Sequence, residues 1–206
     1  LRHQDDSTEV AEVAAEFAGN GVVGFDLAGP EAGFPASDHI EALRVARRAG
    51  LHLTIHAGEA DGPLSMADAL DCGAERIGHG VRIVEDVVSH SGQIVEFGPI
   101  AKRIHRDGIP LEACPWSNIH TGAVASAAAH PALQLLQAGF IVTLNTDHRL
   151  MSNTSMSKEF RLADAEIGFS IDDLRQATDF AVQAAFCDET TRVSVAERVA
   201  AGYEAI

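Results

Sequence analysis

Residues 51–59 have the sequence Leu-His-Leu-Thr-Ile-His-Ala-Gly-Glu, and this stretch decides the fold that we predict. Apolar and polar side chains alternate along 51–56, which is the pattern of a half-buried β-strand. His56 then lies at the carboxyl end of the strand, Gly58 lets the chain turn, and Glu59 returns beside the imidazole. Catalytic groups of α/β barrels gather at such strand ends. The stretch therefore predicts a parallel α/β protein with two candidate catalytic side chains.

Similar apolar runs, each ending in polar residues, recur along the chain. They begin near residues 21, 51, 76, 109 and 140, with a period of about 25 to 33 residues. Helical patterns lie between them, and only helices follow the last run, over about 155–167, 171–186 and 190–203. The repeat predicts parallel strands with helical crossovers, and the polar strand ends favour a (β/α)8 barrel. Five strands are predicted, whereas such a barrel has eight.

Composition limits the classes of function. The 206 residues are 46% hydrophobic and 22% charged, which is typical of a soluble globular domain. Thirty acidic residues against 15 basic ones give a net charge of −15 without a basic block, so we expect no nucleic-acid partner. No apolar run reaches the roughly 18 residues of a membrane span. Cys72, Cys114 and Cys187 lack zinc-site spacing and indicate free thiols in a reducing cytoplasm.

Several sequence motifs for nucleotides and metals are absent. Neither GxGxxG nor GxxxxGK[ST] occurs, which disfavours a dinucleotide or P-loop fold. The HExxH motif and the HxE with PCxxC signature are absent as well. His56, His79 and Asp147 remain, at three different predicted strand ends. Nitrogen and oxygen ligands from separate strands suit Zn²⁺ with a position open for water.

Five short motifs follow one another along the chain. They are Asp26-Leu27-Ala28-Gly29, His56-Ala57-Gly58-Glu59, Gly78-His79-Gly80, Cys114-Pro115-Trp116-Ser117-Asn118 and Asn145-Thr146-Asp147. In this order they resemble the adenosine deaminase family, and bacterial members most. The resemblance spans essentially the whole chain. It implies a TIM barrel of the metal-dependent hydrolase type, with residues 1–206 as the C-terminal portion of a single barrel domain that holds about strands four to eight and the C-terminal helices.

The resemblance also implies a zinc-dependent site. His56 matches one zinc ligand, and Asp147 matches another that also contacts the attacking water. His79 matches the histidine that orients this water and helps to deprotonate it. The family's first strand carries a His-x-His pair that completes the zinc site, and none of the ten histidines here forms such a pair.

Three further matches concern a small-molecule purine substrate. Glu59 matches the acid that protonates purine N1, and the backbone N–H of Gly29 matches a donor to purine N3. His148 stands where the family has an acid or amide facing purine N7, and a neutral imidazole can also donate a hydrogen bond there. The implied reaction is hydrolytic deamination of adenosine or 2′-deoxyadenosine to inosine or 2′-deoxyinosine plus ammonia, in the cytoplasm.

Alternatives remain open at this point. His148 leaves adenine or another aminopurine as the alternative substrate. A non-catalytic fragment, or half of a split barrel, is the alternative to an enzyme. Five strands leave two sheet edges, which natural proteins cover or pair, so we expect a missing N-terminal segment or a second chain to complete the barrel.

Each candidate residue also has a purely structural interpretation. His56 and His79 fit buried core histidines, Asp147 fits a helix N-cap, Glu59 fits a solvated loop acid, and Gly29 fits a turn glycine. Ser117 and Asn118 either contact the ligand or fix their loop. We interpret the remaining histidines outside the predicted strands and motifs as surface residues: His3, His39, His90, His105, His120 and His130.

Overall fold

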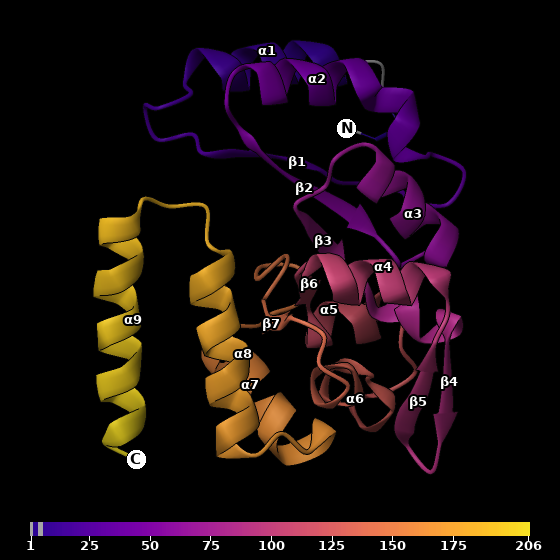
Figure 1. The fold of residues 1–206 in the computed structure, drawn as a ribbon, viewed down its shortest axis with the longest axis vertical. Coiled ribbons are helices and arrows are strands. Elements are labelled where there is room, and N and C mark those ends of the chain that lie inside the picture. The colour runs from indigo at the N-terminus through magenta and orange to yellow at the C-terminus, as the bar shows by residue number, and fades with distance from the viewer. Residues whose placement is uncertain (1, 4–5) are drawn as a thin grey trace.

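Five parallel strands form the central sheet of this computed structural model, which describes residues 2–3 and 6–206 (Figure 1). In sheet order they are β1 (Gly24–Leu27), β2 (His52–Ala57), β3 (Arg76–His79), β6 (Leu111–Ala113) and β7 (Val142–Leu144). All four neighbouring pairs are parallel. Their carboxyl ends therefore meet at one edge of the sheet, as the strand repeat predicts.

Helices make the connections between the strands and follow the last one. The α-helices are α1 (Ser7–Glu16), α2 (Ile40–Arg48), α3 (Pro63–Asp71), α4 (Pro99–Asp107), α5 (Pro115–His120), α6 (Ala132–Gln137), α7 (Met156–Leu162), α8 (Ile171–Ala184) and α9 (Glu189–Glu204). Short 3₁₀ segments cover Ala36–His39, Val81–Asp86 and Ala127–Ala129, and the π-helical turn Ala163–Ile167 extends α7. Proline occupies the first turn of α3, α4 and α5, where its missing N–H costs no hydrogen bond.

The core lies between the sheet and its helices. Leu53, Ile55 and Ile77 on the central strands are fully buried. In β2 the polar Thr54 is buried too, because it faces the inner side of the sheet, where Arg76 donates to its hydroxyl at 3.1 Å. The strand predicted to be half-buried therefore has little exposed surface beyond its first residue, as in the strands of parallel sheets.

A β-hairpin absent from the sequence prediction follows the third parallel strand. Strands β4 (Val87–His90) and β5 (Gln93–Phe97) pair antiparallel and stand apart from the main sheet (Figure 1). Ser91 and Gly92 join them, and both have positive φ, at 50° and 80°. A two-residue turn with positive φ at both positions matches the twist of a hairpin. The signal in the sequence is thus the Ser-Gly pair between two short apolar runs.

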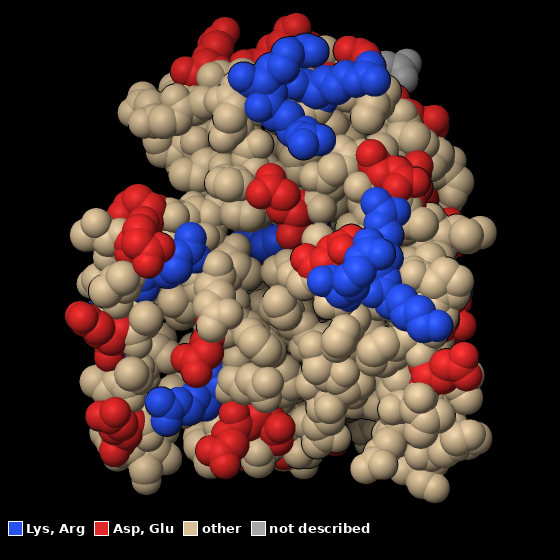
Figure 2. Space-filling model, in the orientation of Figure 1, with Lys and Arg blue, Asp and Glu red and all other residues tan. Residues whose placement is uncertain are grey.

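Charged side chains are distributed in clusters on the face shown in Figure 2. Basic groups gather over α2 and over α4, and acidic groups lie beside both helices. Arg44 is ion-paired with Glu41 on α2, and Arg103 of α4 is ion-paired with Asp71. On this face the two basic clusters do not join into a continuous basic surface. In the described part of the chain, no helix has the length and apolar character needed to cross a membrane.

Candidate active site

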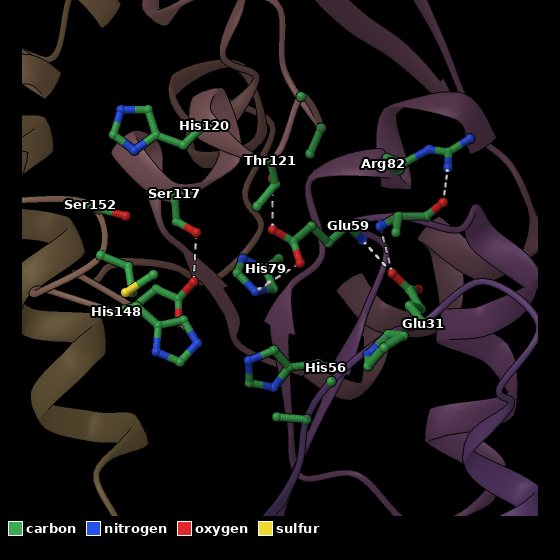
Figure 3. A pocket seen from close by; sticks show the side chains of 18 residues that line it. Glu31, His56, Glu59, His79, Arg82, Ser117, His120, Thr121, His148 and Ser152 are labelled. Carbon is green, nitrogen blue, oxygen red and sulfur yellow. Dashed lines mark hydrogen bonds and ion pairs between the residues drawn. The ribbon is translucent and has the colours of Figure 1, made fainter. Parts of the chain in front are cut away.

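A cavity of about 830 Å³ opens at the carboxyl ends of the parallel strands (Figure 3). This volume lies within the range of small-molecule sites. Its lining draws on the loops that follow β1, β2, β3, β6 and β7. All six residues predicted for the site line it, namely Gly29, His56, Glu59, His79, Asp147 and His148. The structure therefore brings together side chains that are up to about 120 residues apart in the sequence, as expected for a barrel.

His56 projects from the end of β2 toward the cavity. Its Nδ1 donates to Oδ1 of Asp26 on the neighbouring strand at 3.0 Å, which leaves Nε2 with a free lone pair. Burial lowers the pKa of His56, but the hydrogen bond to Asp26 and the carboxylates of Asp147 and Glu59 raise it more. Position 78 must be glycine here, because a Cβ on Gly78 would lie 2.8 Å from the His56 Nδ1.

Glu59 lies in the loop after β2 and points into the cavity (Figure 3). One carboxyl oxygen accepts a hydrogen bond from the Thr121 hydroxyl at 2.9 Å. The other lies 3.4 Å from Nε2 of His79. Two side chains from other loops therefore fix the direction of this carboxyl group.

Glu31, which the sequence did not reveal as a site residue, holds the loop that carries Glu59. Its Oε1 accepts from the N–H of Gly58 at 2.6 Å. Its Oε2 accepts from the N–H groups of Glu59, Ala60 and Asp61 at 2.9, 2.7 and 3.1 Å. The Glu31 residue is only 4% exposed. A buried carboxylate with four backbone donors is a strong local constraint, because each bond is charge-assisted.

His79 ends β3 and is buried, with 2% exposure. Its φ of +65° is unusual for a residue with a side chain, and such conformations persist only when the surroundings impose them. Its Nδ1 contacts the side-chain nitrogen of Asn118 at 3.0 Å, and its ring meets that of His56 edge to face at 4.9 Å. Burial lowers the pKa of His79 more than the neighbouring Glu59 raises it.

Asp147 follows β7 and also has a positive φ, of +51°. The Ser117 hydroxyl donates to its Oδ2 at 2.6 Å, and Nε2 of His148 lies 3.6 Å from its Oδ1. The His148 side chain is 77% exposed at the rim, whereas that of Asp147 is 15% exposed. Ser117 and Asn118, both on α5, therefore each hold a side chain of the site, and Ser117 also lines the cavity.

Two of the histidines predicted to be at the surface are buried, so that prediction was wrong for them. His39 and His130 are 8% and 5% exposed, whereas the other four are exposed. His39 bonds to the Ser7 hydroxyl at 2.9 Å, and His130 bonds to Oδ1 of Asn118 at 3.2 Å. Each ring is buried because both of its nitrogens find a polar partner.

Two side chains at the cavity are of the types that bind zinc in other proteins. The free Nε2 of His56 and the carboxylate of Asp147 both line the cavity, and both are donors that Zn²⁺ accepts. Within residues 2–3 and 6–206, no group of three or more His, Cys, Asp or Glu side chains is arranged to hold a metal ion.

Comparison with known proteins decides the family. The family model described as adenosine deaminase matches residues 1–202. The chain belongs to the adenosine deaminase family. Adenosine deaminase 1 of Streptomyces coelicolor is 44% identical over 95% of the chain, and adenosine deaminase of Mycobacterium leprae is 46% identical over 97%. The chain spans 50% and 55% of the length of these two relatives.

The solved structures extend the adenosine deaminase assignment to the fold. The crystal structure of an adenine deaminase from Arthrobacter aurescens superposes with a TM-score of 0.84 at 25% identity. It matches 97% of this chain, and this chain covers 59% of it. The predicted fold class is thereby confirmed: this adenosine deaminase family member forms part of a TIM barrel, with five of its parallel strands in the described residues.

Proposed function

We propose that the protein with this chain hydrolyses adenosine or 2′-deoxyadenosine to inosine or 2′-deoxyinosine and ammonia. The observation that carries the proposal is that Glu59, His79 and Asp147 converge with His56 on one cavity, in a chain of the adenosine deaminase family. We propose Glu59, His79 and Asp147 as catalytic residues. Residues 1–206 are then the C-terminal portion of one barrel domain.

Glu59 is proposed as the acid that acts on the purine ring. A proton given by its carboxyl group to purine N1 makes C6 electrophilic, because the ring then accepts electron density at N1. The Thr121 hydroxyl and the imidazole of His79 restrict the rotation of this carboxyl group. The loop that carries Glu59 is held in place because the Glu31 carboxylate accepts hydrogen bonds from the backbone N–H of Glu59 and from those of three neighbouring residues.

Asp147 and His79 are proposed to flank the water that attacks C6. The Asp147 carboxylate is positioned by the Ser117 hydroxyl and can accept the proton that this water loses. The oxygen then bonds to C6, and the proton held by Asp147 passes to the amino group, which leaves as ammonia. The C6 hydroxyl loses its proton as the carbonyl forms, and this proton restores the acid form of Glu59. The backbone N–H of Gly29 and the imidazole of His148, both at the cavity, are proposed to bind purine N3 and N7.

Zn²⁺ is the proposed cofactor, with His56 and Asp147 as two of its ligands. When bound, it supplies a Lewis acid that makes water nucleophilic near neutral pH. The hydrogen bond between His56 and Asp26 supports this assignment, since metal-binding histidines usually donate their other N–H to a carboxylate. The remaining ligands, and strands beside the edge strands β1 and β7, are proposed to come from a further N-terminal segment or a second chain.

Adenine is the second candidate substrate. Its support is the structural likeness to an adenine deaminase, together with the exposed His148 at the position proposed for purine N7. Comparing the turnover of adenosine with that of adenine separates the two candidates. The cysteines Cys72, Cys114 and Cys187 are free, which supports the cytoplasm as the proposed location.

The proposed function is tested by the absorbance change from adenosine to inosine with the intact protein, alongside its zinc content. Glu59→Gln should lower kcat by about 10²- to 10⁴-fold, the contribution of a general acid, while purine binding persists. Glu41→Gln, a change of the same kind on the exposed face of α2, should leave turnover unaltered. Undiminished turnover in Glu59→Gln would contradict the role of Glu59, and a zinc-loaded protein inert toward both substrates would refute the function.

A further inference from the structure

A buried chain of hydrogen bonds runs from two backbone N–H groups to His79. The backbone N–H of Ala132 donates to Nδ1 of His130 at 3.2 Å. Nε2 of His130 lies 3.2 Å from Oδ1 of Asn118, and Nδ2 of Asn118 lies 3.0 Å from Nδ1 of His79. The same Asn118 Oδ1 accepts from the backbone N–H of Cys114 at 3.2 Å. The three side chains are nearly inaccessible, with exposures of 5%, 0% and 2%.

The direction of every bond in this chain follows from the two backbone groups. A backbone N–H can only donate, so Asn118 must turn its oxygen toward Cys114. His130 must accept at Nδ1 from Ala132, and its Nε2 then carries the proton that it donates to Asn118. Burial lowers the pKa of His130 to about 4, which keeps this ring neutral at physiological pH.

The amide of Asn118 therefore presents its NH₂ group to His79. An NH₂ group donates and cannot accept, so Nδ1 of His79 must accept with its lone pair. The neutral ring then carries its single proton on Nε2, which points at the cavity and lies 3.4 Å from Glu59. A second proton, on Nδ1, would face the NH₂ donor of Asn118, so the geometry of this contact opposes the imidazolium form.

We propose that Asn118 is a positioning residue that holds His79 as the tautomer with its proton on Nε2, so that His79 serves the reaction as a hydrogen-bond donor and not as a proton acceptor. Nε2 has no lone pair in this tautomer. In the reaction this single N–H donates to the oxygen of the attacking water, while the Thr121 hydroxyl continues to hold the Glu59 carboxyl group, and the proton of that water passes to the Asp147 carboxylate. The catalytic part of this inference rests on the proposed deamination, whereas the tautomer itself does not.

The tautomer is measured directly by ¹⁵N NMR of the histidine rings in the intact protein, since protonated and unprotonated ring nitrogens have distinct shifts. The His79 signals are identified by their loss in His79→Gln. We expect Nε2 protonated and Nδ1 unprotonated. A proton on Nδ1 of the unaltered protein would overturn the proposal, and this measurement requires neither substrate nor any further variant.

Asn118→Asp reverses the direction of the hydrogen bond between residue 118 and Nδ1 of His79 without changing the size of the side chain. Its carboxylate still accepts from Cys114 and His130, but it requires His79 to donate from Nδ1. We expect the Nδ1 signal of His79 to become that of a protonated nitrogen. We expect kcat to fall by about 10²- to 10⁴-fold with little change in KM, because donor geometry toward the reacting oxygen is lost. Asn118→Ala should give a mixture of tautomers and a smaller loss of kcat.

Asn20→Asp is the matched control, because Asn20 is exposed in a turn far along the chain from α5 and the change adds the same charge. It should alter neither the His79 signals nor kcat. An unchanged His79 tautomer in Asn118→Asp would overturn the role of Asn118. If the tautomer behaves as expected but no purine is deaminated, the proposed function fails while the positioning role stands, so the two failures are distinguishable.

Discussion

Replacing Glu31 with glutamine tests how the loop that carries Glu59 is held. In the structure the two oxygens of Glu31 accept four backbone hydrogen bonds, one at Oε1 from Gly58 and three at Oε2 from Glu59, Ala60 and Asp61. The exchange is nearly isosteric, so any effect comes from hydrogen bonding and charge. Glutamine keeps one acceptor oxygen and turns the other into an NH₂ donor.

The expected cost follows from the number of bonds. With its oxygen at the Oε2 position, the introduced glutamine would keep three bonds and leave the Gly58 N–H against a donor, which costs about 1–3 kcal/mol. The three remaining bonds lose charge assistance, at roughly 1 kcal/mol each. Because a loop relaxes and such terms are not additive, we expect Glu31→Gln to lower the free energy of unfolding by about 3–5 kcal/mol.

Urea unfolding with linear extrapolation measures this loss, and the deamination assay follows its consequence for Glu59. The control is Glu41→Gln, which alters an exposed ion pair on α2 and should change stability by about 1 kcal/mol or less. We also expect a fall in kcat, since the loop no longer fixes the carboxyl group of Glu59. If Glu31→Gln is no more destabilising than Glu41→Gln, the four hydrogen bonds do not hold the loop and the reasoning is wrong.

Two further predictions concern buried groups around the site. Gly78→Ala places a methyl group 2.8 Å from Nδ1 of His56, so zinc content or turnover should fall by about 10- to 100-fold. The control Gly202→Ala lies in open space on α9 and should change neither quantity, and equal behaviour of the two variants would contradict crowding at His56. Burial lowers the pKa of His130 from 6.5 to about 4, so the unfolded chain binds this proton more tightly than the folded chain does. The stability that depends on neutral His130 is therefore fully present above about pH 6.5 and is lost as the pH falls toward 4. The free energy of unfolding of the unaltered protein, relative to His130→Gln, should therefore drop by about 2 kcal/mol between about pH 7 and pH 4.5, and a constant difference would show that His130 is not held neutral by the fold.

The strand ends were predictable because one-dimensional patterns determine them. His56, His79 and Asp147 each follow an apolar run, and parallel strands place their carboxyl ends at one edge. Order along the chain and strand spacing were therefore enough to predict that these side chains share a cavity. The hairpin at 87–97 was missed because its two strands are short and half-exposed, with a Ser-Gly turn as the main signal.

The groups that orient the site were not predictable in the same way. Glu31 meets backbone N–H groups about 30 residues away, and loop geometry rather than periodicity decides that contact. His130 was assigned to the surface because it lies outside the predicted strands and motifs. It is buried because Ala132 and Asn118 satisfy both of its nitrogens, and such a pair of partners exists only in the folded chain.

The chemistry of the site is divided unequally within the described residues. Each group proposed to handle protons has an orienting partner there: Thr121 for Glu59, Asn118 for His79 and Ser117 for Asp147. All three partners lie between residues 117 and 121, on α5 or directly after it. One short segment that follows β6 in the chain therefore orients all three side chains. For the proposed metal, His56 and Asp147 are the two ligands that we propose in this part of the chain, and no group of three or more His, Cys, Asp or Glu side chains in the described residues is arranged to hold a metal ion. The orientation of Glu59, His79 and Asp147 is thus fixed within the described residues, whereas the proposed metal has two proposed ligands there.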